Sequence, residues 1–337
     1  MNALRDEIFR DLEVVGEDSE GQYGYFPDQR PLQVLLNNCI IPLDKPAGQT
    51  THQVVAWVRQ LLKAERAGHS GTLDPPATGL LPIALGDATK ALSTLLVGPK
   101  QYFAVMRLHS PVGEAELSEI ISQFKGDIYQ RPPERSAVKR VRRVRTIYEL
   151  EMVEREGNLV LLRTLCQAGT YVRKLVYDMG EVLGVGASLI ELRRTRVSDL
   201  TEEKGMTRLH ELAFASALQK EKGDEDMLRH LVWPIEKALT HIKAVAVKDT
   251  AVDALCHGAT LTVPGVARIP RHLNRGDLVA IYTQKGEVVA LATAKMNRDE
   301  LMDAERGVAF VPNRVIMAAG TYPKAWKTSA SAHIESP

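Results

Sequence analysis

The segment from Gly68 to Gly79 (GHSGTLDPPATG) holds a single carboxylate in a stretch rich in glycine and proline. Glycine lets the backbone adopt unusual dihedral angles and come close to a ligand, and proline stiffens the chain. A carboxylate presented in this way suits nucleophilic work at a glycosidic carbon or an activated ring. Asp74 is therefore the candidate catalytic residue, although an aspartate that only caps a turn is the commoner explanation of such spacing.

A second candidate for chemistry is Arg173, which falls in the first turn of a helix predicted over residues 170–183. Thr170 is the predicted N-cap of this helix. The positive end of the helix dipole disfavours a cation at this place. Arg173 is easier to understand if it faces a carboxylate or a phosphate. The alternative is a solvated arginine that points away from the helix terminus.

These candidates need a scaffold of mixed strands and helices. Apolar alternation predicts strands and helical spacing predicts helices, while the glycine and proline content of residues 66–79 predicts a loop. The order lacks a strict β-α-β rhythm, which favours an α+β fold with a mixed, largely antiparallel central sheet and flanking helices. The expected strands are 39–43, 80–85, 102–109, 146–153 and 159–165, and the expected helices are 52–65, 114–124 and 170–183.

The texture of the chain changes near residues 238–245. From Ala244 onward, short apolar runs alternate with turn signals, which predicts a small C-terminal β-barrel or sandwich. The polar first part, to about Pro31, reads as an arm, and the tail after Trp326 as disordered. The expected organisation is an N-terminal arm (1–35), a catalytic domain (36–242), a small β-domain (243–326) and a disordered tail (327–337).

The charge of the chain is unevenly distributed, although the net charge is only +1. Residues 131–145 contain seven Lys or Arg and one Glu, whereas the first twenty residues contain seven acids and two arginines. A dense basic stretch is typical of proteins that bind a phosphate backbone. A solvated strand and turn is an equally good explanation of this composition. The candidate RNA contacts in this stretch are Lys139, Arg140, Arg142 and Arg143.

Several classes of protein are disfavoured. The three cysteines are far apart, which argues against a disulfide framework and against a zinc site of paired thiolates. No metal-binding motif stands out, so we expect chemistry without a metal or other cofactor. No apolar run of about 18 residues exists, and the acidic N-terminus is unlike a secretory signal. We therefore expect a protein that does not associate with membranes and stays in the cytoplasm.

The segment GHSGTLDPPATGLLPIALGDATK resembles the signature of the TruB-type pseudouridine synthases, in which the aspartate of the G-T-L-D-P run is the catalytic carboxylate. That residue is Asp74 here. Further segments resemble family motifs in the same order, namely LDKPAG, KQYFAVMRL, AGTYVRKL and GVGASLIELRRTR. The resemblance runs from about residue 36 to residue 196. It implies an isomerase that converts a uridine of RNA, in place, into pseudouridine.

The same resemblance implies roles for the residues of these motifs. Tyr102 would support the face of the target base, Leu192 would close the base pocket, and Arg173 would keep Asp74 ionised and oriented. His69 would help to hold flipped-out nucleotides. Without the resemblance, Tyr102 and Leu192 would be read as core residues of their strands. The remaining residues that it assigns to substrate binding are Lys45 and Tyr171.

The C-terminal segments HGATLTVPGVARI and NRGDLVAIYTQKGEVVALATA resemble a PUA domain, a small β-barrel that binds structured RNA. The resemblance implies RNA contacts at Gly258, Ala259, Arg271 and Arg275, with the arginines contacting phosphates. Arg268 and Lys295 would make similar contacts. The alternative is a barrel that only packs on the first domain.

Two subfamilies are compatible with these motifs. A long segment before LDKPAG, a short RPPERSAVKRVRRVRTIYEL passage and a complete PUA-like domain favour the dyskerin type, whose archaeal version works in box H/ACA particles. The partners would then be a guide RNA, target ribosomal or transfer RNA, a glycine-arginine-rich protein, a small zinc-ribbon protein and a kink-turn-binding L7-type protein. Pro76, Ala77 and GDATK depart from that branch. The alternatives are a stand-alone enzyme for the T-loop of transfer RNA, a base-removing glycosidase and a non-catalytic RNA-binding scaffold.

Overall fold

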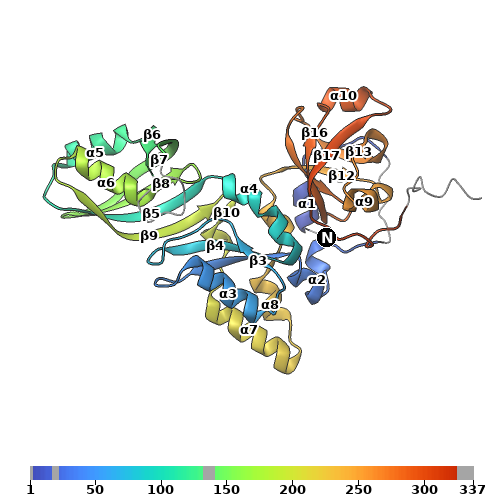
Figure 1. Cartoon of the computed structure of the whole chain (residues 1–337), viewed down its shortest axis with the longest axis horizontal. Coiled ribbons are helices and arrows are strands. Elements are labelled where there is room, and N and C mark those ends of the chain that lie inside the picture. The colour runs from blue at the N-terminus through green and yellow to red at the C-terminus, as the bar shows by residue number, and fades with distance from the viewer. Residues whose placement is uncertain (1–2, 17–22, 132–140, 325–337) are drawn as a thin grey trace, which may run out of the picture.

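The computed structural model describes residues 3–16, 23–131 and 141–324, and these form two β-sheets with helices around them (Figure 1). The large sheet has ten strands, and only the β4–β9 pair is parallel. The expected mixed, largely antiparallel sheet is therefore confirmed. In spatial order its strands are β11 (Trp233–Pro234), β2 (Cys39–Lys45), β4 (Thr78–Leu85), β9 (Ala187–Val197), β5 (Lys100–Leu108), β8 (Leu159–Cys166), β7 (Arg143–Glu156) and β6 (Gly126–Gln130), with β3 (Ala67–His69) beside β4 and β10 (Leu200–Thr201) beside β9.

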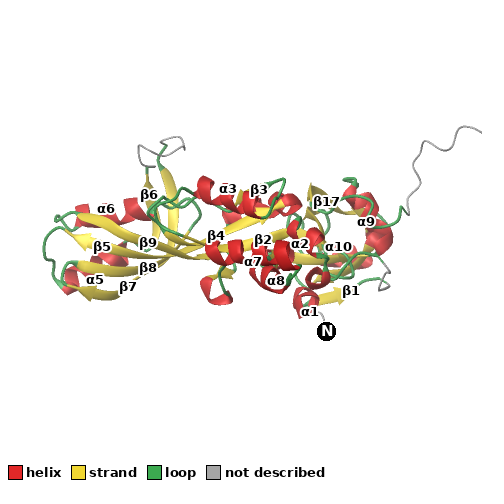
Figure 2. Cartoon of the chain, turned by 90° about the horizontal axis from the view of Figure 1, so that it is seen from below, coloured by secondary structure: helices red, strands yellow, loops and turns green. Residues whose placement is uncertain are grey.

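The helices of the large domain form two groups that cover different parts of the sheet. One group lies at the end far from the small domain, and the other lies around β2 and β4 (Figures 1 and 2). Each group encloses its own apolar core. The first group is α5 (Glu114–Gln123) and α6 (Val172–Val182), the second is α2 (Leu32–Leu36), α3 (Thr51–Leu61), α7 (Leu209–Lys222) and α8 (Asp226–Leu231), and α4 (Leu92–Val97) lies near β10.

Two side chains, Tyr102 and Leu192, pack against both of these apolar cores. They lie on the neighbouring strands β5 and β9, where Tyr102 is opposite Arg194 and Leu192 is opposite Ala104. Side chains two residues apart on a strand point to the same face. Tyr102, Leu192 and Arg194 therefore share one face of the sheet, at the point where its two halves meet.

The small domain is built on a seven-stranded sheet whose strand order is open, in the manner of half a barrel. Residues 243 onward supply six of these strands, which agrees with the change of texture seen in the sequence. The strands are β1 (Leu12–Val14), β14 (Val266–Pro270), β12 (Lys243–Val247), β15 (Leu278–Tyr282), β16 (Val288–Ala294), β17 (Val308–Val315) and β13 (Leu261–Thr262), with α1 (Ala3–Phe9), α9 (Asp249–Cys256) and α10 (Arg298–Asp303) beside them. Short 3-10 helices, η1 (Pro27–Gln29), η2 (Gly86–Ala91), η3 (Glu202–Lys204), η4 (Ile235–Ala238) and η5 (Val263–Gly265), connect elements of both domains.

The N-terminal segment differs from the arm that its composition suggests. Strand β1 pairs with β14, and Phe9 is buried with its ring 6.4 Å from that of Tyr282. The sequence of this segment is mostly acidic, so its few buried apolar side chains, Leu4 and Phe9, gave no clear pattern. The first residues of the chain are thus part of the fold of the small domain.

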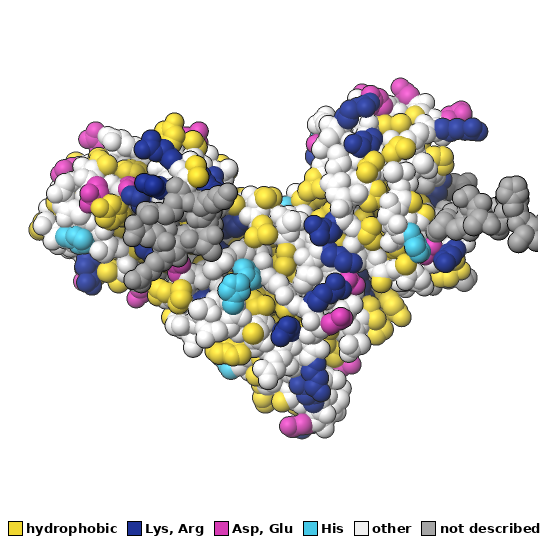
Figure 3. All heavy atoms as spheres, in the orientation of Figure 1, with side chains coloured by type: hydrophobic (Ala, Val, Ile, Leu, Met, Phe, Trp, Pro, Cys, Tyr) yellow, Lys and Arg dark blue, Asp and Glu magenta, His cyan; other side chains and the backbone are white. Residues whose placement is uncertain are grey.

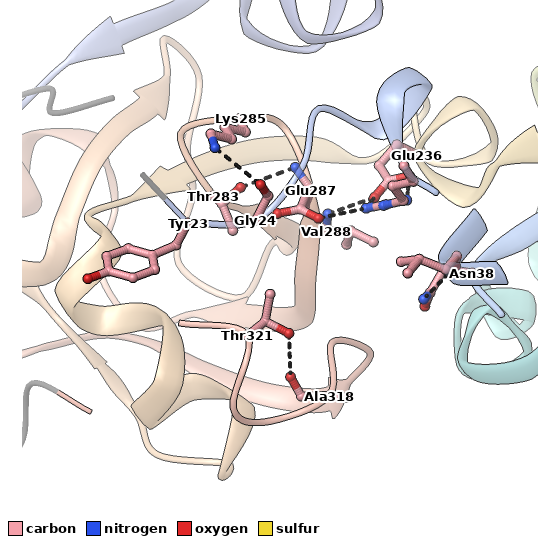
Figure 4. Close-up of polar contacts among 12 residues, drawn as sticks. Tyr23, Gly24, Asn38, Glu236, Thr283, Lys285, Glu287, Val288, Ala318 and Thr321 are labelled. Carbon is pink, nitrogen blue, oxygen red and sulfur yellow. Dashed lines mark hydrogen bonds and ion pairs between the residues drawn. The ribbon is translucent and has the colours of Figure 1, made fainter. Parts of the chain in front are cut away.

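A buried ionic group joins the two domains (Figure 4). Both terminal nitrogens of Arg30 donate to Glu236, at 2.9 and 2.7 Å, and Nη2 lies 3.5 Å from Glu287. The backbone N–H of Val288 donates to Glu236, and the Tyr322 hydroxyl donates to Glu287. Burial raises the pKa of Glu287, and the neighbouring Arg30 opposes this. The large domain and the small domain are therefore held together by charged groups that are buried away from water.

Three local expectations need correction. Residues 66–79 are not all loop, because β3 and the start of β4 lie within them; β3 pairs with the end of β4, and the start of β4 pairs with β2 and β9. The helix expected over 52–65 ends at Leu61. Thr170 is not an N-cap: the capping position of α6 belongs to Tyr171, which makes no side-chain cap bond, and the Thr170 hydroxyl donates to the carbonyl of Gln167 at 2.7 Å.

Candidate active site

The loop that bears Asp74 is fixed from beneath by a buried lysine. The Nζ atom of Lys45 donates to the carbonyls of Pro46 (2.8 Å), Pro75 (3.0 Å) and Ala77 (2.9 Å). Two of the three donors of the ammonium group are thus directed at the backbone that follows Asp74, and the third is directed at the carbonyl of Pro46. Burial lowers the pKa of Lys45, and the nearby Asp74 carboxylate opposes this. Lys45 belongs to the site, but its contacts are with the loop.

A threonine secures the other side of the same loop. The Thr51 hydroxyl, in the first turn of α3, donates to the carbonyl of Leu73 at 2.9 Å and accepts from its N–H at 3.0 Å. The N–H of Gly48 also donates to the carbonyl of Pro75 at 2.8 Å. The backbone before and after Asp74 is therefore held at four positions, as its glycine and proline content suggested.

Asp74 forms an ion pair with Arg173, which the structure brings to it from 99 positions away in the sequence. Arg173 is the second residue of α6, so its predicted place in a first helical turn is correct. The two side chains are 50% and 53% exposed. The carboxylate is thus both oriented by a cation and accessible to a ligand.

The start of α6 is tied to the large sheet by an amide that the sequence did not single out. The backbone N–H of Tyr171 donates to Oε1 of Gln130 at 2.9 Å, and Nε2 of Gln130 donates to the carbonyl of Tyr171 at 3.1 Å. Gln130 ends β6 and is buried. These paired bonds place the first turn of α6, and with it Arg173. The polar end of a short strand gave no signal by which to predict this.

Tyr102 and Leu192 form an apolar surface beside the loop. Both are only partly buried. Burial raises the pKa of Tyr102. The buried guanidinium of Arg194 opposes this rise, and the nearby Asp74 carboxylate adds to it. The phenol is therefore neutral near pH 7. An aromatic and an aliphatic side chain beside an exposed carboxylate can hold a planar ring, and this arrangement suits a nucleobase.

His69 lies at the end of β3, directly before the loop. Its Nδ1 accepts from the N–H of Gly71 at 3.2 Å, and its ring lies 5.5 Å from that of His52 in an edge-to-face arrangement. Burial lowers the pKa of His69, and the neighbouring His52 and Arg194 lower it further. His69 is therefore a neutral imidazole near pH 7. His52 is exposed and was missed in the sequence, where it is a single polar residue in an amphipathic helix.

The predicted basic RNA contacts of residues 139–143 are described only in part. Lys139 and Arg140 lie outside the described residues. Arg143 begins β7 and pairs with Gln130, and the guanidinium of Arg142 lies 6.0 Å above the ring of Tyr129. Both arginines therefore lie on the hairpin whose strand β6 holds the start of α6.

In the small domain the predicted contacts occupy two turns. Gly258 and Ala259 follow α9, and their N–H groups donate to carbonyls of that helix. Gly258 has φ +85°, and nothing lies within 4 Å of a Cβ added there, so its surface is open. Arg271 is exposed in the turn before β15, whereas Arg275 pairs with Glu300 at 2.8 Å. Figure 3 shows Lys and Arg side chains on this domain and on the flank of the large domain.

Among the residues that the structure describes, no group of three His, Cys, Asp or Glu side chains could hold a metal ion. In the same residues, no helix has the length and apolar character needed to cross a membrane.

Models of known protein families match three successive parts of the chain. A model described as the N-terminal domain of TruB family pseudouridylate synthases matches residues 59–172, the C-terminal domain of tRNA pseudouridylate synthase B matches residues 173–240, and the PUA domain matches residues 243–316. "Probable tRNA pseudouridine synthase B" of Methanopyrus kandleri is 49% identical over 320 residues, with 94% of each chain covered. The protein of the same name from Pyrococcus abyssi is 43% identical over 332 residues, covering 96% of this chain and 99% of that one.

Two solved structures are also similar over nearly the whole chain. One is described as an H/ACA RNP bound to a substrate RNA containing 2′-deoxyuridine, with a TM-score of 0.87 at 41% identity, covering 94% of this chain and 97% of that chain. The other is a Cbf5-Nop10-Gar1 complex, with a TM-score of 0.86 at 43% identity, covering 93% and 96%. These similarities extend across both sheets described above.

Proposed function

Because the chain belongs to the TruB family of pseudouridine synthases, we propose that Asp74 is the residue with which it converts uridine into pseudouridine. The observation that supports this most directly is the Asp74–Arg173 ion pair, half exposed on a loop that buried groups hold in place. Tyr102 and Leu192 lie on the sheet beside it. This is the geometry that a carboxylate needs in order to meet a base that has left its helix.

The reaction follows from these positions. A uridine leaves the RNA stack at a cost of roughly a few kcal/mol, and its ring packs against Tyr102 and Leu192. The C1′–N1 bond then breaks, its electron pair stays on N1 of the base, and the Asp74 carboxylate bonds to C1′. The base turns, C5 bonds to C1′ and displaces the carboxylate, a general base takes the proton from C5, and N1 gains a proton, so that no atom is lost. Arg173 keeps the carboxylate ionised and oriented throughout.

Lys45 and His69 act through the loop in this proposal. Each donor of Lys45 already has a carbonyl partner, so its part is to fix the backbone of Asp74. The neutral ring of His69, with the ring of His52 edge-to-face against it, offers an aromatic face on which a flipped-out nucleotide can stack. Tyr171 lies on this side of the site, at the position directly before α6.

The target uridine, we propose, is selected by a box H/ACA guide RNA. The similar structures at 41% and 43% identity were solved as parts of an H/ACA RNP and of a Cbf5-Nop10-Gar1 complex. By this analogy the chain would bind relatives of Nop10 and Gar1, a kink-turn-binding L7-type protein, and guide RNA through its PUA domain. The named relatives are archaeal, and archaeal cells have no nucleus, so the particle would work in the cytoplasm.

A second function deserves the same test, because the relatives bear the name of a transfer-RNA enzyme. Full-length protein should be incubated with transfer RNA and ribosomal RNA fragments, with and without candidate guide RNAs, and pseudouridine mapped. Guided modification that depends on the guide supports the H/ACA role. A transfer-RNA yield that no guide raises would favour the stand-alone enzyme. Release of free uracil would indicate a glycosidase. The absence of any product with every RNA would indicate a non-catalytic binding scaffold.

The RNA contacts of the small domain are best tested by substitution. Deleting residues 244–323 would unpair β1 and expose Phe9 and Glu236, so a truncated chain would confuse binding with folding. Arg271→Ala removes an exposed cation, and Gly258→Asp places a carboxylate on the open turn after α9. We expect both to weaken guide-RNA binding, and Arg271→Ala to reduce its salt slope by roughly one phosphate contact. Unchanged binding in both would move the guide RNA elsewhere.

A further inference from the structure

Arg194, on β9, is the largest of the fully buried side chains of the described residues, with 1% of its surface exposed. Its Nε donates to the carbonyl of Leu80 at 2.8 Å, and Nη2 donates to the carbonyl of Gly71 at 3.2 Å. The guanidinium also interacts with the Tyr102 hydroxyl, since Tyr102 lies opposite Arg194 across the β5–β9 ladder. One side chain thus joins β4, the loop of Asp74 and the aromatic residue of the base pocket.

Arg194 makes these contacts without a carboxylate partner. In the described residues no carboxylate forms an ion pair with it, whereas its neighbour Arg193 pairs with both Asp44 and Glu202. Removing an ionised group from water costs several kcal/mol when no opposite charge compensates it. Folds keep such unfavourable groups mainly at functional sites. A merely structural tie between strands would need no charge, so the location of this cation calls for another explanation.

We propose that Arg194 is a positioning residue for the isomerisation. By holding the carbonyl of Gly71, three residues before Asp74, and the Tyr102 hydroxyl at once, it sets the catalytic carboxylate relative to the ring that supports the base. This inference rests on the function proposed above for Asp74.

The chemistry of the side chain supports the proposal. The planar guanidinium presents donors in fixed, divergent directions, and lysine cannot reproduce that fork. Gly71 has φ +117°, a conformation that glycine adopts freely, so an outside contact is needed to fix its carbonyl. Misplacement of a catalytic group by 1 Å can reduce a rate about 10²-fold. A group that touches neither RNA nor solvent can therefore control turnover.

The first experiment compares Arg194→Lys and Arg194→Met with wild type, using full-length protein and saturating RNA. Both variants should reduce kcat by at least about tenfold, while RNA affinity stays within about twofold. Arg193→Met is the matched control, because it removes a cation from the next position of β9, on the opposite face. Its turnover should remain within about twofold of wild type. A loss of RNA affinity with kcat intact in the Arg194 variants would overturn the proposal.

The second experiment is a double-mutant cycle with Tyr102→Phe, which removes the hydroxyl and keeps the ring. If Arg194 acts through that hydroxyl, the double variant should be no slower than the slower single variant. Effects that multiply would show independent, merely structural roles and would refute the proposal. Arg194→Lys serves in the cycle if Arg194→Met does not fold. Asp74→Asn, measured in parallel, separates the two ideas. If Asp74→Asn retains turnover, the proposed site fails. If Asp74→Asn is inactive and the effects of the Arg194 and Tyr102 substitutions multiply, only the proposal for Arg194 is refuted.

Discussion

Replacement of Arg173 by lysine tests the ion pair on which the proposed site depends. Lysine keeps the positive charge but loses the planar fork that grips a carboxylate at two points. Because the two side chains are 53% and 50% exposed, the pair contributes little to stability, about 0.2–1 kcal/mol for pairs of this kind. The melting temperature should therefore change by no more than about 4 °C.

Turnover should respond far more strongly than stability. We expect Arg173→Lys to lower kcat about 10²-fold, which corresponds to about 2.7 kcal/mol of lost transition-state stabilisation. That is several times what the exposed pair can contribute to folding. RNA affinity should change little, because the arginine is directed at Asp74 and not at a phosphate.

The assay is single-turnover pseudouridine formation at saturating RNA, with affinity measured separately on the same RNA. Lys174→Gln is the matched control, since Lys174 is the next residue of α6 and forms an ion pair with Asp178 that is also partly exposed, at 31% and 27%. It should cost a similar amount of stability and leave kcat unchanged. If Arg173→Lys instead abolishes RNA affinity and leaves kcat at saturation intact, Arg173 is a phosphate contact and the reasoning is wrong.

Three further predictions follow from the same contacts. Asp74→Asn should keep RNA binding and lower turnover by at least about 10²-fold, and a rate within tenfold of wild type would contradict the assignment. Lys45→Met should leave three carbonyls without a donor, lowering the free energy of unfolding in urea by about 3 kcal/mol and slowing turnover; unchanged values for both would show that the loop does not need this clamp. Because burial raises the pKa of Glu287, there is a pH range in which the folded protein keeps a proton that the unfolded chain has lost. The free energy of unfolding should therefore fall as pH rises above the usual glutamate pKa of about 4, and Glu287→Gln should flatten this slope. An identical slope in the variant would place the titration elsewhere.

Most of the sheet was predictable because apolar alternation determines which face of a strand is buried. The strand that bears Tyr102 was found in this way, whereas β9, which bears Leu192, was not among the expected strands. The short strand β3 and the first two residues of β4 were not, since their sequence has no apolar periodicity. Strand β3 depends on its pairing with residues 83–85, and the start of β4 depends on its pairing with β2 and β9. Strand β1 was missed for a related reason, because it is stabilised by β14, which lies more than 250 residues away.

The candidate site shows a similar division. Asp74 and Arg173 could be proposed from local features, an unusual loop and a cation in a first helical turn, and the structure brings them together. Gln130, His52 and Arg194 could not, because what distinguishes them is burial or a neighbour and not their type. Arg194 in particular lies in the run ELRRTR, where three arginines look alike in sequence. Only strand register shows that Arg194 faces Tyr102 and that Arg193 faces away.

The charges of the site are arranged in two layers, and this explains how an exposed carboxylate can be held accurately. Lys45 and Arg194 lie beneath the loop and are fully buried. Their N–H groups are directed at backbone carbonyls and at the Tyr102 hydroxyl. Arg173 lies above, in solvent, and contacts Asp74 itself. Water screens the upper pair, so it can adjust as RNA arrives, whereas the lower cations act in a low dielectric and resist displacement. A loop fixed from below needs little from its substrate to become competent, which leaves the binding energy of the RNA available for extruding the uridine.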